Sequence, residues 1–227
     1  MSGFVPGATA LEQTVHAAAE AASGGSPRRV LDLGGGPGVF AERMARRWPG
    51  AAVTLLDLDP MLLALARAGV PGTVSVVDAD LASRDWDART GAGFDLVTAV
   101  MTVHYLAPEQ ARAMYAAAYR AVAPGGLLAV ADLMPDDEVP GLMRALEPGP
   151  GEAAAELAWA QWWGELAEVP ECRGLMSARA EVFRDRQPAE FVAGPGWHAA
   201  AARDAGFAEA GVVWRCGRYA ALAAVRR

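Results

Sequence analysis

Acidic residues and glycines stand close together in the first part of the chain, most densely where Asp32 is followed by glycines at 34, 36 and 38. Residues 30–38 run from a short apolar stretch through Asp32 into this loop. Glycines at that spacing let the backbone turn sharply out of a buried strand and approach a ligand where a Cβ would collide. A carboxylate beside the loop repels phosphates and attracts cations. The segment therefore predicts a binding site for a positively charged ligand.

A dinucleotide-binding oxidoreductase is one alternative for such a loop. Its G-x-G-x-x-G fingerprint, counted from Gly34, would place glycine or alanine at position 39, where this chain has Val39. Asp32 would also repel a pyrophosphate. Both residues disfavour NAD, and a titration with reduced nicotinamide cofactor would separate the two classes.

Further acidic residues stand at or just after the expected ends of strands. Asp57 and Asp132 end two apolar runs, and Asp80 follows a third, with Asp78 as the competing choice there. In an open α/β sheet, ligands bind beyond the carboxyl ends of the parallel strands, so these acids should converge there with Asp32.

His104 follows a fourth apolar run and adds an imidazole, which titrates near neutral pH and is able to take a proton from a hydroxyl. The alternative roles are structural. His104 would then pack against the ligand or cap a loop, and Asp132 would serve only as a polar strand end.

Strands and helices alternate from Arg29 to about Asp132, which is typical of parallel βαβ units. The predicted strands are 29–33, 52–57, 73–78, 94–100 and 126–132, and the predicted helices are 10–22, 38–47, 60–68 and 108–122. A helix at 198–205 and strands at 208–214 and 218–225 follow, the two strands forming a hairpin at Cys216-Gly217. This hairpin places a reversed strand at one edge of the sheet.

The period-2 apolar pattern disappears between residues 135 and 195, which indicates a helical insertion. Its helix at 152–168 carries Trp159, Trp162 and Trp163, whose spacing of three and four places Trp159 on one face with both others. Such a face is able to stack on a planar ligand or to form an apolar core. Arg184 lies in the same insertion, where it would contact an anion or remain solvated.

Composition excludes several classes of function. The net charge is −7 and no stretch is strongly basic, which counts against a nucleic-acid partner. Lysine is absent, so a Schiff base and a P-loop lysine are excluded. No apolar run approaches the roughly 20 residues of a membrane span. Without an export signal, Cys172 and Cys216 are expected to be reduced thiols in the cytoplasm, and no cluster has metal-ligand spacing.

The order of these motifs resembles the class I S-adenosylmethionine (SAM)-dependent methyltransferase family over about residues 30–133, with a weaker match beyond. The motifs that carry the resemblance are Asp32-x-Gly-x-Gly-x-Gly38 and the segments 53–60, 76–81, 94–100 and 121–126. Phe4-Val-Pro-Gly7, His104-Tyr105-Leu106 and Ala131-Asp132-Leu133 look like a bacterial small-molecule branch. That branch usually has a second histidine where this chain has Tyr105, a departure that weakens any role carried over to that position.

The resemblance implies an α/β fold with a Rossmann-like, doubly wound sheet of seven strands, mostly parallel with an antiparallel C-terminal hairpin strand. Residues 1–227 would form one domain, with a helical acceptor-binding lid at 135–195 inserted after strand 5. SAM is the implied cofactor, with Asp57 accepting from both ribose hydroxyls and Asp80 from the adenine amino group. The implied cofactor-binding residues are Asp32, Gly34, Gly36, Gly38, Asp57, Leu58, Asp80, Leu81 and Met101.

The implied activity is methyl transfer to a small-molecule acceptor by in-line displacement, in bacterial specialised metabolism. His104 and Asp132 are the implied catalytic residues. The implied acceptor-binding residues are Phe4, Tyr105, Trp159, Trp163 and Arg184. Two alternatives stay open, a SAM-binding enzyme with a reaction other than methylation and, with less support, a tRNA methyltransferase. We expect a cytoplasmic protein with no metal, nucleic-acid or membrane partner, and leave open whether it is a homodimer.

Overall fold

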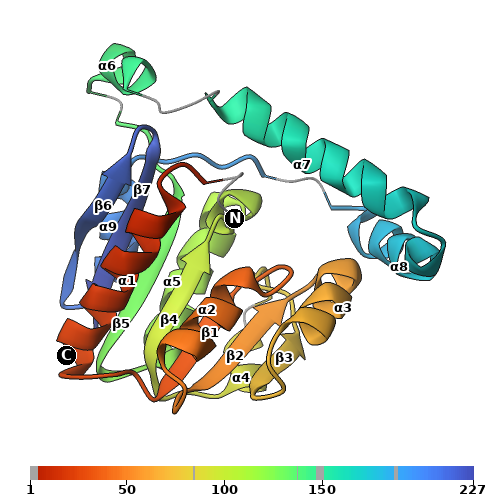
Figure 1. Ribbon diagram of the computed structural model, residues 1–227. Helices are drawn as coiled ribbons and strands as arrows, with labels where there is room; N and C mark the ends of the chain where they lie inside the picture. The colour runs from red at the N-terminus through yellow and green to blue at the C-terminus, as the bar shows by residue number, and fades with distance from the viewer. Residues whose placement is uncertain (1–4, 84, 137, 147–150, 187–188) are drawn as a thin grey trace.

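A computed structural model describes residues 5–83, 85–136, 138–146, 151–186 and 189–227. Within these ranges the chain forms one sheet with the strand order β3-β2-β1-β4-β5-β7-β6 (Figure 1). The strands are β1 (Arg29–Leu33), β2 (Ala52–Asp57), β3 (Val74–Asp78), β4 (Phe94–Val100), β5 (Val122–Leu133), β6 (Glu209–Cys216) and β7 (Tyr219–Val225).

The direction of the strands confirms the predicted fold class. Strands β1 to β5 pair in parallel, whereas β7 runs antiparallel to both of its neighbours, β5 and β6. From β1 the chain winds outward through β2 and β3 and then returns to add β4 on the other side of β1. The point between β1 and β4 is therefore the topological switch point, where ligands bind in open α/β sheets.

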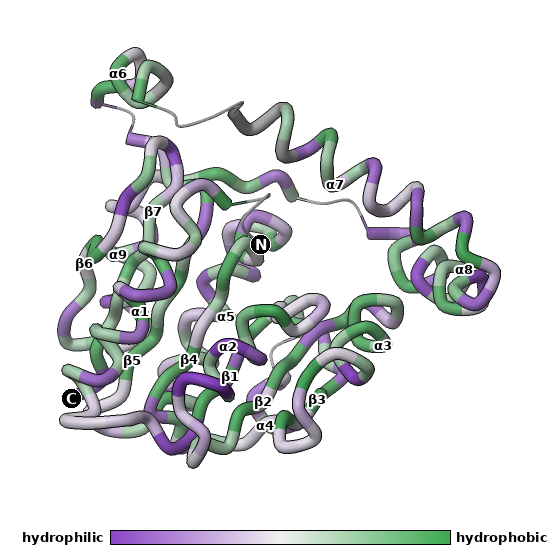
Figure 2. Tube along the Cα trace, viewed as in Figure 1, coloured by the Kyte–Doolittle hydropathy of each residue, from purple (hydrophilic) through white to green (hydrophobic). Residues whose placement is uncertain are grey.

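Helices cover both faces of this sheet. One face carries α1 (Ala8–Ser23), α2 (Val39–Arg47) and α3 (Pro60–Gly69). The other carries α4 (Trp86–Thr90), α5 (Pro108–Ala121) and α9 (Pro195–Asp204). The hydrophobic core accordingly has two layers, and Figure 2 shows the hydrophobic residues gathered along β4 and α3.

The insertion after β5 contains more helix than predicted. Its described parts are α6 (Pro140–Ala145), α7 (Gly151–Glu168), the 3₁₀ turn η2 (Pro170–Cys172) and α8 (Arg173–Phe183), of which only α7 was predicted. No residue of α8 is fully buried, and its apolar side chains Leu175, Met176, Val182 and Phe183 are only partly covered. The other element missed in the body of the fold, α4, has only five residues.

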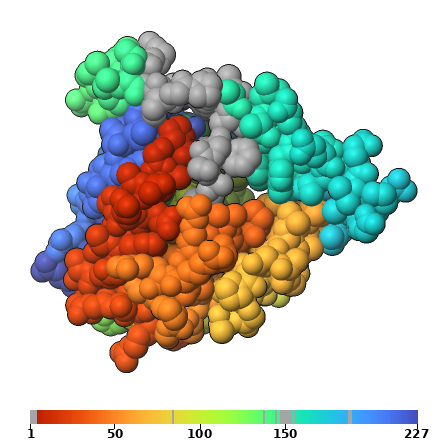
Figure 3. Space-filling view, viewed as in Figure 1, coloured from red at the N-terminus to blue at the C-terminus, as the bar shows by residue number. Residues whose placement is uncertain are grey.

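The lid crosses the carboxyl edge of the sheet. In Figure 1, α7 extends from the β6–β7 side toward α3, and α8 follows it beside α3. Residues of α8 contact α3, and α7 contacts α8 and η2. Figure 3 shows the atoms of α8 lying directly against those of α3. The lid is thus attached to the helix that follows β2.

Candidate functional site

The glycine loop leaves β1 at the switch point with three left-handed residues, Gly34 (φ 62°), Gly36 (φ 55°) and Gly38 (φ 88°). A Cβ on Gly34 would lie 2.3 Å from Cγ2 of Thr102, so the protein itself requires this glycine. A Cβ on Gly36 would meet nothing closer than a Leu62 methyl at 3.9 Å. The space at the loop therefore opens beside Gly36.

Asp57 faces this space from the end of β2. One carboxylate oxygen accepts from the Gly36 N–H at 2.8 Å, and the other accepts from the N–H groups of Leu58 (2.7 Å) and Asp59 (2.9 Å). Burial raises the pKa of Asp57 above its ordinary value, and these backbone bonds oppose the rise. They fix the carboxylate next to Gly36 and occupy three of its roughly four lone-pair sites, which leaves about one for a further donor.

Asp32 lies beneath the loop and is 1% exposed. Its Oδ1 accepts from the Thr98 hydroxyl at 2.7 Å, while its Oδ2 has no hydrogen-bond partner among the described residues. Desolvation raises the pKa of Asp32 from 3.8 to about 7, and the bond from Thr98 opposes this rise. Because a buried, half-satisfied carboxylate is costly to ionise, a cation above the loop would favour its charged form.

His104 and Asp132, predicted together, are in direct contact. His104 follows β4 in the 3₁₀ turn η1 (Val103–Tyr105), and its Nδ1 lies 2.7 Å from Oδ1 of Asp132. The other oxygen of Asp132 accepts from the N–H groups of Thr102 (3.2 Å), Val103 (2.8 Å) and His104 (3.2 Å).

This contact assigns different roles to the two residues. A carboxylate with so many donors is an acceptor, so Nδ1 of His104 is the donor in this contact and Nε2 faces away from Asp132. In this arrangement Asp132 holds the ring, and Nε2 would be the nitrogen open to an acceptor.

Tyr105 extends the site from His104. The two rings lie 4.0 Å apart between centroids at 45°. Tyr105 is 51% exposed, yet burial raises the pKa of its hydroxyl, with Asp132 and Asp57 raising it further and Arg179 lowering it. Asp132, Asp57 and the lid residue Arg179 thus lie close enough to the Tyr105 hydroxyl to influence its pKa.

The acid of the third motif is already engaged by the lid. Oδ1 of Asp80 accepts from the Ala82 N–H at 2.8 Å, and Oδ2 lies 2.8 Å from a guanidinium nitrogen of Arg186. Asp78 ends β3 as an exposed residue. Leu81, beside Asp80, is buried, and Met101 after β4 holds a positive φ of 54°. The two candidate acids thus differ in their surroundings, since Asp80 is held by Ala82 and Arg186 whereas Asp78 is exposed.

A second arginine, Arg179, attaches α8 to α3. Its Nε lies 2.6 Å from Oδ2 of Asp59, whose other oxygen caps the first N–H groups of α3. The guanidinium lies 3.9 Å from the centre of the Trp163 ring and 5.0 Å from that of Phe183. This one side chain therefore joins α7, α8 and the first turn of α3.

Sequence patterns did not reveal either of these lid arginines. The pattern singled out Arg184, which pairs with Glu181 at the surface, both side chains being 62% exposed. Arg179 and Arg186 reach Asp59 and Asp80 across more than a hundred positions of sequence. An arginine side chain carries no local sequence signal for such a distant partner.

The tryptophans of α7 cluster as their spacing predicts. Trp159 stacks on Trp162 with ring centres 5.0 Å apart, and Trp163 meets Trp159 edge-on at 5.6 Å. Phe4, the remaining predicted acceptor residue, lies outside the described residues. Beyond the lid the chain returns to the body at Phe191, whose N–H donates to the His104 carbonyl at 3.0 Å.

The other two histidines have structural positions. His198 is buried and lies 2.9 Å from the Tyr115 hydroxyl, and burial lowers its pKa to about 4. His16 packs edge-on against Trp48 in the core, and burial lowers its pKa too. Because burial lowers both pKa values, both rings are neutral at physiological pH.

Replacing Arg179 by methionine is expected to release α8 from α3. The variant loses both the ion pair with Asp59 and the cation–π contact with Trp163. Limited proteolysis should then cut within 173–186 several-fold faster, with mass spectrometry locating the cuts. Arg184→Met removes an exposed pair from the same part of the lid and serves as the control. Equal cleavage rates in the two variants would contradict the role of Arg179.

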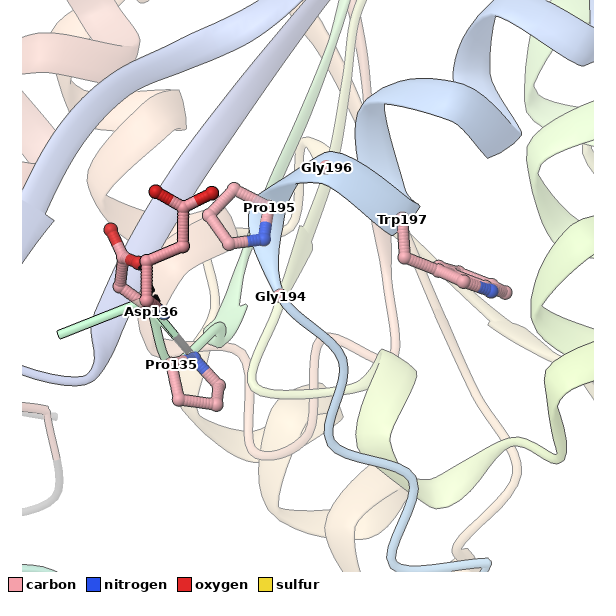
Figure 4. A pocket seen from close by; sticks show the side chains of 7 residues that line it. Pro135, Asp136, Gly194, Pro195, Gly196 and Trp197 are labelled. Carbon is pink, nitrogen blue, oxygen red and sulfur yellow. Dashed lines mark hydrogen bonds between the residues drawn. The ribbon is translucent and has the colours of Figure 1, made fainter. Parts of the chain in front are cut away.

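A separate hollow of about 470 Å³ lies where the chain leaves β5 and α9 begins. Figure 4 shows Asp136 and Pro195 on one side of it and Trp197 pointing away from them. Trp197 instead lies under the guanidinium of Arg112, 4.9 Å from the ring centre. None of the predicted site residues lines this hollow, so it is distinct from the site at His104 and Asp132.

Two classes of feature are absent from the described parts of the chain. No group of three or more histidine, cysteine or acidic residues is placed to hold a metal ion. No helix within the same ranges is long and apolar enough to cross a membrane.

Comparison with known proteins agrees with this geometry. Residues 30–126 match the family described as a methyltransferase domain. Trans-aconitate 2-methyltransferase of Methylobacterium nodulans is 38% identical over 156 residues, 67% of this chain and 57% of that protein. The Paracidovorax citrulli protein of the same name is 34% identical over 140 residues, 62% of this chain and 50% of its own length. The chain thus spans about half the length of the curated relatives it matches.

Solved structures share the fold. The SAM-dependent methyltransferase SibL is 25% identical with a TM-score of 0.59, covering 98% of this chain and 60% of that one. An O-methyltransferase family protein from Burkholderia thailandensis is 22% identical with a TM-score of 0.61, covering 96% and 57%.

Proposed function

Because the chain belongs to the class I SAM-dependent methyltransferase family, whose cofactor is SAM, we propose that it transfers a methyl group to a hydroxyl of a small-molecule acceptor. The observation that carries the proposal is the His104–Asp132 pair at the carboxyl edge of the sheet, beside the glycine loop. This pair supplies a base where an acceptor would meet a ligand held by that loop.

The residues present fit SAM on three counts. Gly36 leaves open space where a Cβ would stand, and Asp57 beside it has a lone pair for one ribose hydroxyl and would accept from the second in place of a backbone donor. Asp32 keeps an unpartnered carboxylate oxygen beneath the loop, which favours a ligand with positive charge. Asp80 remains the proposed acceptor for the adenine amino group. When bound, SAM supplies a methyl group activated by its sulfonium.

The chain contributes position and a proton acceptor to the reaction. Asp132 holds the His104 ring through Nδ1, so that Nε2 is able to take the hydroxyl proton of an acceptor. The tryptophans of α7 and the docked α8 cover the edge where transfer would occur and exclude water from it. The main contribution of such an arrangement is orientation of the acceptor for in-line displacement.

The wider setting belongs to the same proposal. The relatives of Methylobacterium nodulans and Paracidovorax citrulli are bacterial proteins named for a small-molecule acceptor. A role in bacterial specialised metabolism rests on the resemblance of residues 104–106 and 131–133 to that branch. The cytoplasmic location, the homodimer and the single-domain organisation with its lid stay predictions.

The direct test is turnover of SAM with a panel of hydroxylated small molecules, followed by mass spectrometry of both products. Methyl transfer should yield S-adenosylhomocysteine and, in equal amount, an acceptor in which a methyl group has replaced the hydroxyl hydrogen. S-adenosylhomocysteine without a methylated acceptor, or a rearranged cofactor, would instead support the alternative of a SAM enzyme with another reaction.

Replacing Asp57 by alanine is expected to weaken SAM binding by about 2–3 kcal/mol, because two charge-assisted hydrogen bonds to the ribose are lost. Calorimetric titration with SAM measures the change. The control is Asp204→Ala, which removes an exposed carboxylate that pairs with Arg112 and is not among the predicted cofactor residues. This variant should bind SAM as the parent protein does. Near-normal affinity in Asp57→Ala would exclude the ribose assignment.

A further inference from the structure

We infer that the lid gates the entry and exit of the cofactor, and that two ion pairs keep it closed. These closing pairs are Arg179–Asp59 and Arg186–Asp80. The inference rests on the proposed function, because it takes Asp57 and Asp80 as residues that hold the adenosine part of SAM. Its support is the place of the two paired acids, the course of the lid between them, and the few other contacts that attach α8.

The two paired acids lie on either side of Asp57. Asp59 donates its N–H to the Asp57 carboxylate at 2.9 Å. On the other side, Asp78 pairs in register with Asp57, and the Ala79 N–H donates to the Asp57 carbonyl at 3.0 Å. Asp80 follows directly after that bond. Both acids therefore border the carboxylate proposed to hold the ribose.

One segment of the lid reaches both acids. Nε of Arg179 lies 2.6 Å from Oδ2 of Asp59, and a guanidinium nitrogen of Arg186 lies 2.8 Å from Oδ2 of Asp80. Between them α8 ends at Phe183, and the Arg186 N–H donates to the Phe183 carbonyl at 3.1 Å, so a further turn continues the helix. The segment 179–186 thus bridges the acids that follow β2 and β3.

The closed lid leaves Asp80 engaged at both carboxylate oxygens. Oδ1 accepts from the Ala82 N–H at 2.8 Å, and Oδ2 pairs with Arg186. The adenine amino group would therefore have to displace Arg186 or bond beside it. In either case the arginine has to move aside while the cofactor enters or leaves.

The remaining attachment of α8 is modest. Its elements of contact are α3, α7 and η2, and none of its residues is fully buried. Apolar burial therefore contributes less to its attachment than to that of the helices in the body. Elements with few buried apolar contacts open locally at low free-energy cost. Breaking the closing pairs would thus free the segment 179–186 without unfolding the sheet.

The closing pairs differ in exposure, which predicts different strengths. In the first, the Asp59 side chain is 4% exposed, and the Arg179 guanidinium also stacks on Trp163. In the second, the side chains of Arg186 and Asp80 are 43% and 26% exposed. Salt screens exposed ion pairs more than buried ones. The second pair should therefore be the weaker one and the one that responds to salt.

The test measures how fast radiolabelled SAM leaves the protein when excess unlabelled SAM is added, and how fast it associates. Arg186→Met should release SAM about threefold faster than the parent protein, the scale of a partly exposed ion pair. Arg179→Met should release it roughly tenfold faster, because a covered pair and a cation–π contact are both lost. Arg173→Met is the control, since it removes the same charge from an exposed position of α8.

A gate accelerates association and dissociation together, so the dissociation constant should change less than either rate. Faster release with unchanged association would make the arginines direct cofactor ligands and overturn the gate. Rates equal to those of the Arg173→Met control would overturn it as well. If SAM does not bind the parent protein at all, the proposed function fails together with this inference.

Ionic strength supplies a second readout. Release from the parent protein should accelerate as salt is raised from about 50 mM to about 500 mM, because the Arg186–Asp80 pair is screened. Most of that acceleration should disappear in Arg186→Met. An equal salt effect in both proteins would assign it to the charges of the cofactor and overturn the role of this pair.

Discussion

Replacing His104 by alanine is expected to lower kcat for methyl transfer by roughly 100- to 10,000-fold, the usual contribution of a general base. The dissociation constant of SAM should change by less than about twofold, because the glycine loop and Asp57 do not depend on the ring. Single-turnover kinetics with a saturating acceptor measure the first quantity, and calorimetry measures the second. The physical reason is the free lone pair on Nε2, which the bond from Nδ1 to Asp132 leaves facing outward.

The control for this prediction is Asp132→Asn. In the amide, the oxygen replaces the carboxylate oxygen that accepts from three backbone N–H groups, and the NH2 group faces Nδ1 of His104. A donor at Nδ1 favours the tautomer with Nε2 protonated. This variant should therefore lose turnover although the imidazole is still present. It should also lose stability, since the carboxylate accepts three N–H groups of the turn after β4. Unchanged turnover in His104→Ala would remove the residue as a base and leave it a packing role.

The affinity for SAM is expected to rise by roughly 100-fold between pH 5 and pH 7.5, with little further change from Asp32 above that range. The pKa of Asp32 is raised by burial to about 7, so at pH 5 nearly every molecule has a neutral carboxyl there. If the charged form binds the cofactor, each unit of pH below 7 reduces the competent fraction about tenfold. Calorimetry across this range measures the slope.

The raised pKa of Asp32 also makes the stability of the unliganded protein depend on pH. Stability falls as pH rises, whereas the affinity for SAM increases. An acid whose folded-state pKa lies above its unfolded value contributes most to stability at low pH, and that contribution declines from about pH 4 to about pH 7. A rise from 3.8 to about 7 corresponds to at most about 4 kcal/mol. Asp32→Asn should bind SAM more weakly, with an affinity and a stability that no longer vary in this window. A pH slope that persists in Asp32→Asn would assign it to another group.

The sheet and the cofactor side of the site could be predicted from sequence because their signals are local. A buried strand, an acid and a glycine loop follow one another within 30–38, and Asp57 ends the next strand. The lid could not be predicted in the same way. Its contacts depend on Arg179 and Arg186 meeting acids that follow β2 and β3, and no local pattern identifies partners that are so distant in sequence.

The loop itself shows another limit of sequence reasoning. The sequence suggests that Gly34 and Gly36 both make room for a ligand, and the structure adds a second requirement for Gly34, where a Cβ would collide with Thr102. Asp132 likewise has the predicted neighbour His104. Its hydrogen bonds from three backbone N–H groups, however, are not indicated by the sequence and are seen only in the structure. Both facts concern tertiary contacts between strands, which residue type does not encode.

The hydrogen bond from Phe191 to the His104 carbonyl has a practical consequence for engineering acceptor range. A chimera that exchanges the lid for that of another protein has a natural downstream junction before Phe191, since a cut beyond it would disturb the backbone of the base. Upstream, the graft has to begin after Asp132, whose carboxylate holds the same turn. Within those junctions the transplanted segment needs arginines at the positions of Arg179 and Arg186, or it will lack its ion pairs with Asp59 at the start of α3 and with Asp80 after β3.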